Sequence, residues 1–319
     1  MITLFRNNHP IALILLVPLA LLSFWNFSSQ PIPSPALPTS MLHNELGDLL
    51  DFIDTNSFWG IFFKLLLLLS MALYLNKLVT DNKLMDRSGY VPAMTFLVFS
   101  ALLPNSLSIL TLLINGLVLV AIRLLIQVYK QDRPNNNLVS TGFCMGLVTG
   151  LIAAHLMFYV WMVIAILIMR PSSIREWLIA TIGFFLPFYF LASIQYLNDK
   201  LDLAALLPEL HISWKLPELS KSAILNNALI VFLPIIGMMA FNQQMNKMVI
   251  LGRKSYLIVF VLYLALLVVM GTDPEHVQAL TGLALIPAAF LFAPFFMVFR
   301  REFIPNLVAL SLLALSLFQ

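Results

Sequence analysis

Charged residues are scarce in this sequence. Asp, Glu, Lys and Arg make up 10% of the 319 residues, whereas about a quarter of the residues of a soluble globular protein are charged. Hydrophobic residues reach 61%, and the mean hydropathy is +0.93. This composition excludes an ordinary soluble globule, and no polar stretch is long enough to form a soluble domain. We therefore predict one integral membrane domain over residues 1–319.

Several residue types and motifs are also missing. Cys144 is the only cysteine in the sequence, so an intrachain disulfide is impossible. There is no Walker loop, GxGxxG, GxSxG or HExxH, and no two of the five histidines are three or four residues apart. These absences leave an ATP-driven pump, a hydrolase of those kinds, a bound metal and a cofactor without support. The bases lie between apolar runs, as orienting charges do, so no nucleic-acid partner is predicted.

Apolar runs close to the ~20 residues that cross a bilayer recur along the whole chain. They predict an all-α fold, a polytopic transmembrane helix bundle of about eleven spans. The predicted helices cover residues 9–27, 57–76, 90–103, 107–128, 138–154, 157–169, 177–196, 223–241, 255–271, 279–299 and 304–318. The third, sixth and eleventh helices are short enough to be re-entrant segments instead.

The Lys and Arg residues predict the orientation of these helices, because the cytoplasmic loops of bacterial membrane proteins are enriched in them. With the N-terminus inside, only four of the eighteen bases fall on the outer side, namely Lys64, Lys200, Lys215 and Lys221. Most of the acids then lie outside. This partition predicts a cytoplasmic N-terminus, an outer C-terminus, and two long outer segments at about 28–56 and 197–222.

The first outer segment carries the candidate catalytic residues. Glu45, Asp48 and Asp51 recur every three residues, with leucines between them, as in an amphipathic helix that lies at the outer interface. Such a helix could hold a carboxylate at the mouth of a membrane cavity, where loss of water raises its pKa toward that of a general base. The alternative is the solvated acidic face of a surface helix.

Three polar residues within the spans are candidate substrate-binding residues. Lys64 lies ~10 Å below the outer surface, and a charge at that depth suggests binding of a lipid phosphate or of an outer acid. Snorkelling to the interface is the alternative for Lys64, and it also explains Arg123 near the inner end of its helix. Asn115 lies deeper, where an amide commonly forms an interhelical hydrogen bond worth about 1 kcal/mol.

Small residues mark one face of a predicted helix. Gly142, Gly146 and Gly150 are spaced four residues apart, which brings them to the same side of a helix. We expect this face to pack closely against the backbone of another helix.

Several stretches together resemble a known family. These are MITLFRNNHPIALILLVPLALLSFW at the start, Asn76-Lys77 with Asp81-Asn82, YVPAMTF and RPSSIREWLIATIGFFLPFYF. They are similar to an uncharacterised family of bacterial inner-membrane proteins, over most of residues 1–200. This resemblance implies a multi-pass protein of the bacterial inner membrane and implies no particular activity.

A looser likeness is to membrane glycosyltransferases and glycan polymerases that use polyprenyl-phosphate-linked sugars. Those proteins also begin with a cytoplasmic N-terminus, one span, and an outer interfacial helix that bears a catalytic acid. In this sequence Glu45, Asp48 and Asp51 would occupy that place. The chain departs from the pattern because it has no adjacent acid pair and no Arg-rich outer loop, so the likeness is an analogy of fold.

Together these observations predict a protein of the bacterial cell envelope that handles a lipid-linked or lipid-like substrate in an outward-facing cavity. The alternatives are a transporter or flippase of lipids or small molecules, and a non-catalytic scaffold subunit of an envelope complex. The expected partners are membrane lipids, a lipid-linked substrate and subunits of an envelope complex.

Overall fold

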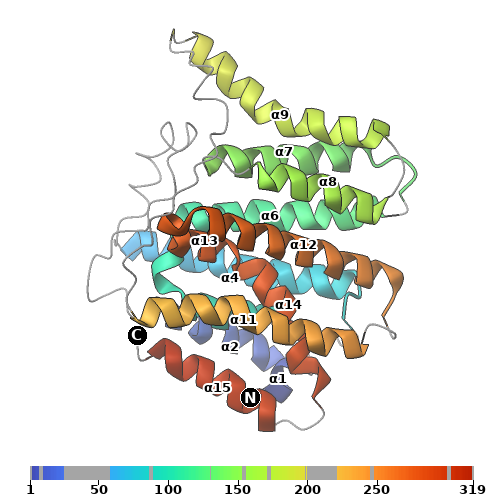
Figure 1. Ribbon diagram of the computed structural model, residues 1–319. Helices are drawn as coiled ribbons and strands as arrows, with labels where there is room; N and C mark the ends of the chain where they lie inside the picture. Colours follow the sequence, from blue (N-terminus) through green and yellow to red (C-terminus); the bar gives the residue numbers. More distant parts are fainter. Residues whose placement is uncertain are drawn as a thin grey trace.

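The computed structural model describes most of the predicted spans. It covers residues 2–6, 10–24, 58–85, 89–129, 131–152, 156–170, 174–197, 199, 221–244, 248–299 and 303–317. Glu45, Asp48 and Asp51 lie outside the described residues, as do nearly all of the two predicted outer segments. Within the described residues all regular structure is helical (Figure 1).

The helices follow the order of the apolar runs. They are α1 (Ile2–Arg6), α2 (Pro10–Leu22), α4 (Phe58–Asp81), α5 (Val91–Leu102), η2 (Pro104–Ser106), α6 (Ile109–Val128), α7 (Asn135–Leu151), α8 (Met157–Met169), α9 (Ile174–Leu197), α11 (Lys221–Gln244), α12 (Ile250–Thr272), η4 (Pro274–His276), α13 (Val277–Leu283), α14 (Leu285–Val298) and α15 (Phe303–Leu317). Each predicted helix overlaps one of these helices, or the pair α13 and α14, so the all-α prediction is confirmed for the described residues.

Length and composition single out the helices that can cross a membrane. Five helices in the described part of the chain are long and apolar enough, namely α4, α6, α9, α11 and α12. The pair α13 and α14 passes the same test together and makes a sixth span if it is counted as one. The chain is therefore a multi-pass helical membrane protein. The helices α2, α5, α8 and α15 are apolar but shorter.

The pair α13 and α14 corrects the prediction of one continuous helix over 279–299. The two helices meet at an angle of 55°, and Ala284 is the junction between them. Pro287 provides a local cause, because proline has no N–H to donate to the carbonyl of Leu283, and its ring crowds that carbonyl. The chain bends where this backbone bond is missing.

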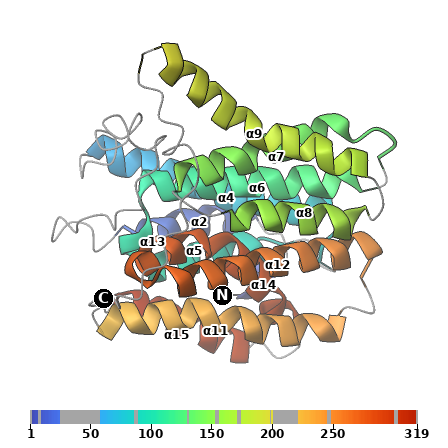
Figure 2. The same cartoon turned by 45° about the horizontal axis from the view of Figure 1, so that its top comes forward.

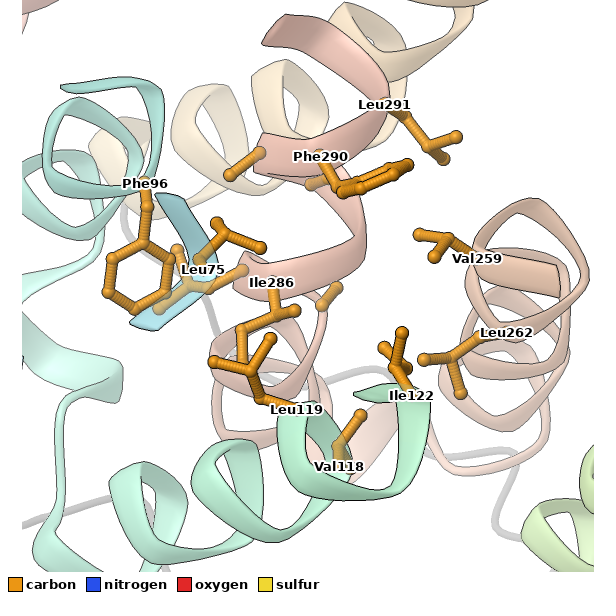
Figure 3. Packing of buried hydrophobic residues seen from close by; sticks show 14 of the residues in the cluster. Leu75, Phe96, Val118, Leu119, Ile122, Val259, Leu262, Ile286, Phe290 and Leu291 are labelled. Atoms are coloured by element: carbon orange, nitrogen blue, oxygen red, sulfur yellow. The ribbon is translucent and has the colours of Figure 1, made fainter. Parts of the chain in front are cut away.

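Two short helices form the centre of the bundle. All residues of α5 are buried, and so are Leu285–Met297 of α14. Phe99 and Phe292 stack between these helices with ring centroids 5.5 Å apart. Figure 3 shows the side chains of the surrounding helices converging on α14, with Leu75 from α4, Leu119 from α6 and Leu262 from α12.

The helix α9 lies at the edge of the bundle, where it packs mainly on α7 (Figures 1 and 2). Only 22% of its apolar stretch is buried, against 67% for α6. Large apolar side chains such as Phe185, Tyr189 and Ile194 are exposed on it. In a membrane protein such a surface faces lipid.

Glycines bring α7 and α9 together. A Cβ atom at Gly142 would lie 2.1 Å from the carbonyl oxygen of Ala180, and one at Gly146 would lie 2.2 Å from that of Phe184. In return, Gly183 of α9 lies against the backbone of Val139. The predicted close packing is confirmed for Gly142 and Gly146, and its partner is α9.

Basic side chains connect several helices at one end of the bundle, which we call the basic end. Arg170, just after α8, donates to the carbonyl oxygen of Gln131 at 2.5 Å and pairs with Glu176 of α9 at 3.2 Å. Lys254 of α12 donates to the carbonyl oxygen of Met169 at 3.0 Å. The ends of α6 and α8 and the starts of α7, α9 and α12 thus lie together, at the right in Figure 1.

Candidate functional site

The three described candidate residues lie on two helices, Lys64 on α4 and Asn115 and Arg123 on α6. These helices run in the same direction. Met71 lies beside Gly116, and Tyr74, further along α4, contacts Arg123, which is further along α6. Both helices therefore approach the basic end at their C-terminal ends.

An apolar groove of about 480 Å³ lies between α4 and α6. It is lined by Leu67, Ser70, Met71 and Tyr74 of α4, by Leu110, Leu113, Gly116, Leu117, Leu119 and Val120 of α6, and by Leu151 of α7. Ser70 uses its hydroxyl within its own helix, donating to the carbonyl oxygen of Leu67 at 2.7 Å. The lining thus presents almost only hydrocarbon.

Gly116 opens the groove at its middle. A Cβ atom at Gly116 would lie 3.1 Å from the terminal methyl group of Met71. A larger residue at position 116 would fill the space, because only the flexible end of Met71 opposes it. The shape of the groove therefore depends on this glycine.

Arg123 lies at the end of the groove that is nearest the basic end. Its Nη1 donates to the hydroxyl of Tyr74 at 2.9 Å, and its guanidinium carbon lies 5.4 Å from the centre of the Tyr74 ring. Tyr74 thus lines the groove and holds the guanidinium at the same time. Asp81, at the end of α4, acts on this guanidinium through space, and no ion pair joins the two side chains in the described part of the chain.

Lys64 lies one helical turn before Leu67, the first groove residue of α4. The residue is 2% exposed, so it is covered by protein. About ten residues separate it from Tyr74, which corresponds to ~15 Å along the helix. Lys64 and Arg123 therefore belong to different levels of the bundle.

Asn115 faces away from the groove. Its Nδ2 donates to the carbonyl oxygen of Thr111 at 3.0 Å and to that of Gly282 in α13 at 2.9 Å. The second bond joins two helices, as the alternative interpretation of this residue predicts. Its Oδ1 has no hydrogen-bond partner among the described residues. Asn115 thus supports the packing of α13 on α6 and does not line the apolar groove.

One acid–histidine pair is not among the predicted site residues. His276 points its Nδ1 at both carboxylate oxygens of Asp273, at 3.0 and 2.9 Å, and Asp273 is 2% exposed. The sequence signal for this pair is the three-residue spacing between Asp273 and His276, just before α13. Within the described residues no three metal-binding side chains lie together.

The described geometry thus keeps Lys64 and Arg123 apart and assigns Asn115 to packing. The predicted acids Glu45, Asp48 and Asp51 lie outside the described residues. Comparison of the chain with family models, with curated proteins and with solved structures gives no match.

Proposed function

We propose that this chain is a multi-pass protein of the bacterial inner membrane that handles a lipid-linked or lipid-like substrate, whose apolar chain lies in the groove between α4 and α6. The groove carries this proposal. Its volume of about 480 Å³ falls within the range of roughly 300–1,000 Å³ that is typical of small-molecule sites. Its hydrocarbon lining suits an acyl or isoprenoid chain, whereas a polar solute would lose its hydrogen bonds there.

The proposal includes a full topology of eleven spans, with the N-terminus inside and the C-terminus outside. The basic end, with Arg170, Arg253 and Lys254, then faces the cytoplasm, in agreement with the enrichment of bases in inner loops. In this orientation the groove extends from the outer end of α6, at Leu110, inward to Val120, a distance of about 15 Å. The groove thus runs along the outer part of α6, and its inner end, at Val120 and Tyr74, lies nearest Arg123.

The proposed chemistry is enzyme-like and takes place on the outer side. One of Glu45, Asp48 and Asp51 serves as a general base, and Lys64 binds a phosphate of the substrate. Burial of Lys64 supports this assignment, because a charge removed from water within a membrane is costly and is most often used. The fold-level analogy with polyprenyl-phosphate-dependent glycosyltransferases is consistent with this use of an outer acid.

A flippase is the second candidate function, and one observation favours it. Two basic side chains, Lys64 and Arg123, lie at different levels along the same pair of helices. A phosphate that moves from one level to the other would meet a cation at each. The third candidate, a scaffold subunit of an envelope complex, needs no bound lipid.

Alanine substitution of Glu45, Asp48, Asp51 and Lys64, one at a time, tests the enzyme proposal. Growth and the profile of surface glycans are measured at matched protein levels. Loss of the glycan product with at least one acid variant and with Lys64→Ala is expected, and full function of all four variants would end the proposal. A flippase instead predicts that depletion of the protein leaves its lipid in the inner leaflet. A scaffold predicts co-purifying partners and tolerance of substitutions in the groove.

A further inference from the structure

We infer that Arg123 binds the phosphate of an anionic phospholipid that enters from the inner leaflet and places one acyl chain in the groove. This inference rests on the proposed lipid-binding groove. It adds a second headgroup position, at the end of the groove opposite Lys64, together with the charge of the lipid and the leaflet from which it comes.

The position of Arg123 is the first argument. The residue lies five positions before Val128, the last residue of α6, which corresponds to about 7–8 Å along the helix. A guanidinium at this depth lies within reach of the headgroup region of the nearer leaflet. Tyr74 connects the two parts of the site, because it lines the groove and accepts a hydrogen bond from Arg123.

The energetics of lipid binding provide the second argument. An acyl chain gains little by leaving the bilayer for an apolar groove, because lipid tails are as apolar as leucine side chains. The groove alone therefore selects weakly among lipids. A charged contact at its end decides which lipid stays, and a guanidinium binds phosphate through two parallel hydrogen bonds.

Arg123 has donors available for this contact. A guanidinium has five N–H groups, and the described contacts assign one of them, on Nη1, to the hydroxyl of Tyr74. The ring of Tyr74 restricts the guanidinium further by a cation–π contact. A positively charged group that is already positioned loses less conformational entropy on binding than a free side chain does.

The positive charge for an anion comes from Arg123 itself. Asp81, the exposed last residue of α4, acts on this guanidinium through space. Lys77, on the same helix, is also exposed and offsets the charge of Asp81. In the proposed orientation these residues face the cytoplasmic leaflet, where the anionic lipids are concentrated.

Native mass spectrometry of the purified full-length chain tests the inference. The protein is titrated with phosphatidylglycerol and with phosphatidylcholine of identical acyl chains. We expect the wild-type chain to bind phosphatidylglycerol preferentially and Arg123→Gln to lose this preference by about tenfold, as expected when a charge-assisted hydrogen bond is removed. Arg175→Gln, an exposed position on α9, removes the same charge far from the groove and should retain the preference.

Two further variants separate this inference from the proposed function. Gly116→Leu fills the groove and should weaken binding of both lipids, whereas Gly271→Leu, at a position with nothing within 4 Å of its Cβ, should weaken neither. If Gly116→Leu acts as expected but Arg123→Gln keeps the wild-type preference, the headgroup assignment is wrong and the groove stands. If Gly116→Leu changes nothing, the groove proposal itself is wrong.

Two controls complete the design. Arg123→Lys keeps the charge without the planar fork, so it should retain part of the preference, and a complete wild-type preference would contradict the bidentate contact. Phosphatidylglycerol is also competed with millimolar inorganic phosphate. If phosphate displaces the lipid, and the acyl chain adds nothing to the affinity, the site binds anions in general and the assignment to a lipid is wrong.

Discussion

Single polar side chains hold distant parts of this bundle together. Arg6 of α1 is 8% exposed and donates through Nε to the carbonyl oxygen of Phe296 at 2.8 Å and through Nη2 to that of Phe299 at 2.8 Å. These carbonyls lie at the C-terminal end of α14, where no helical N–H follows to satisfy them. The negative end of the helix dipole adds to the attraction.

Replacing Arg6 should therefore destabilise the bundle. We expect Arg6→Gln to lower the free energy of unfolding by about 2 kcal/mol, because hydrogen bonds to a charged group are lost while the carbonyls stay buried. Unfolding of the purified protein in mixed micelles, followed by circular dichroism, measures the change. Arg175→Gln serves as the control, since Arg175 is exposed, and equal stability of the two variants would contradict the role of Arg6.

Asn115 permits a test that depends on the direction of its hydrogen bonds. Asn115→Asp replaces the donor by an acceptor that faces the carbonyls of Thr111 and Gly282, and it buries a charge, so we expect a loss of about 3–5 kcal/mol. Asn115→Leu removes the bonds and also the unpaired Oδ1, so we expect a loss of about 1 kcal/mol. Thermal unfolding of both variants, purified in parallel, measures the difference. Equal stability of the aspartate and leucine variants would contradict this account.

At the scale of elements, the pairing of α7 with α9 depends on glycine. We expect Gly146→Ala to cost about 1–3 kcal/mol, because the new methyl group meets the carbonyl oxygen of Phe184, which cannot turn aside as a side chain can. Gly271→Ala adds the same group where nothing lies within 4 Å, and its effect should stay within about 0.5 kcal/mol. Resistance to unfolding by sodium dodecyl sulfate measures the stability of both variants. Equal resistance would contradict the close packing of α7 on α9.

The sequence predicted the helices of the described residues well, but it did not distinguish the bend between α13 and α14 from the sites of the other prolines. Long apolar runs separated by charges position helices almost by themselves, because unpaired backbone groups are too costly in hydrocarbon. The bend depends on less distinct signals. Pro18, Pro187, Pro234 and Pro294 all lie within helices that continue past them, so Pro287 did not stand out among them.

The candidate site was predicted in part. Arg123 could be identified because a charge in a run of Leu, Ile and Val is conspicuous. The groove could not, because it depends on two helices that are separated by α5 and that run in the same direction. Gly116 alone gives no sign of which helix it faces, and Tyr74 became relevant only through its contact with Arg123.

At the scale of the whole molecule, the proposed orientation can be measured by labelling with a membrane-impermeant maleimide. In a Cys144→Ala background, we expect Thr272→Cys to react in intact cells and Arg133→Cys to react only after the inner membrane is permeabilised. Both positions are exposed, and they lie at opposite ends of the bundle. The reverse pattern would contradict an inner N-terminus.

The most direct test of the proposed function is whether the groove holds lipid when the protein leaves the membrane. Lipid retained by the gently purified chain is identified and counted by mass spectrometry for the wild type, Gly116→Leu and Gly271→Leu. We predict that the wild type and Gly271→Leu retain the same lipid and that Gly116→Leu loses it while remaining folded. Retention of this lipid by Gly116→Leu at the wild-type level would contradict the assignment of the groove.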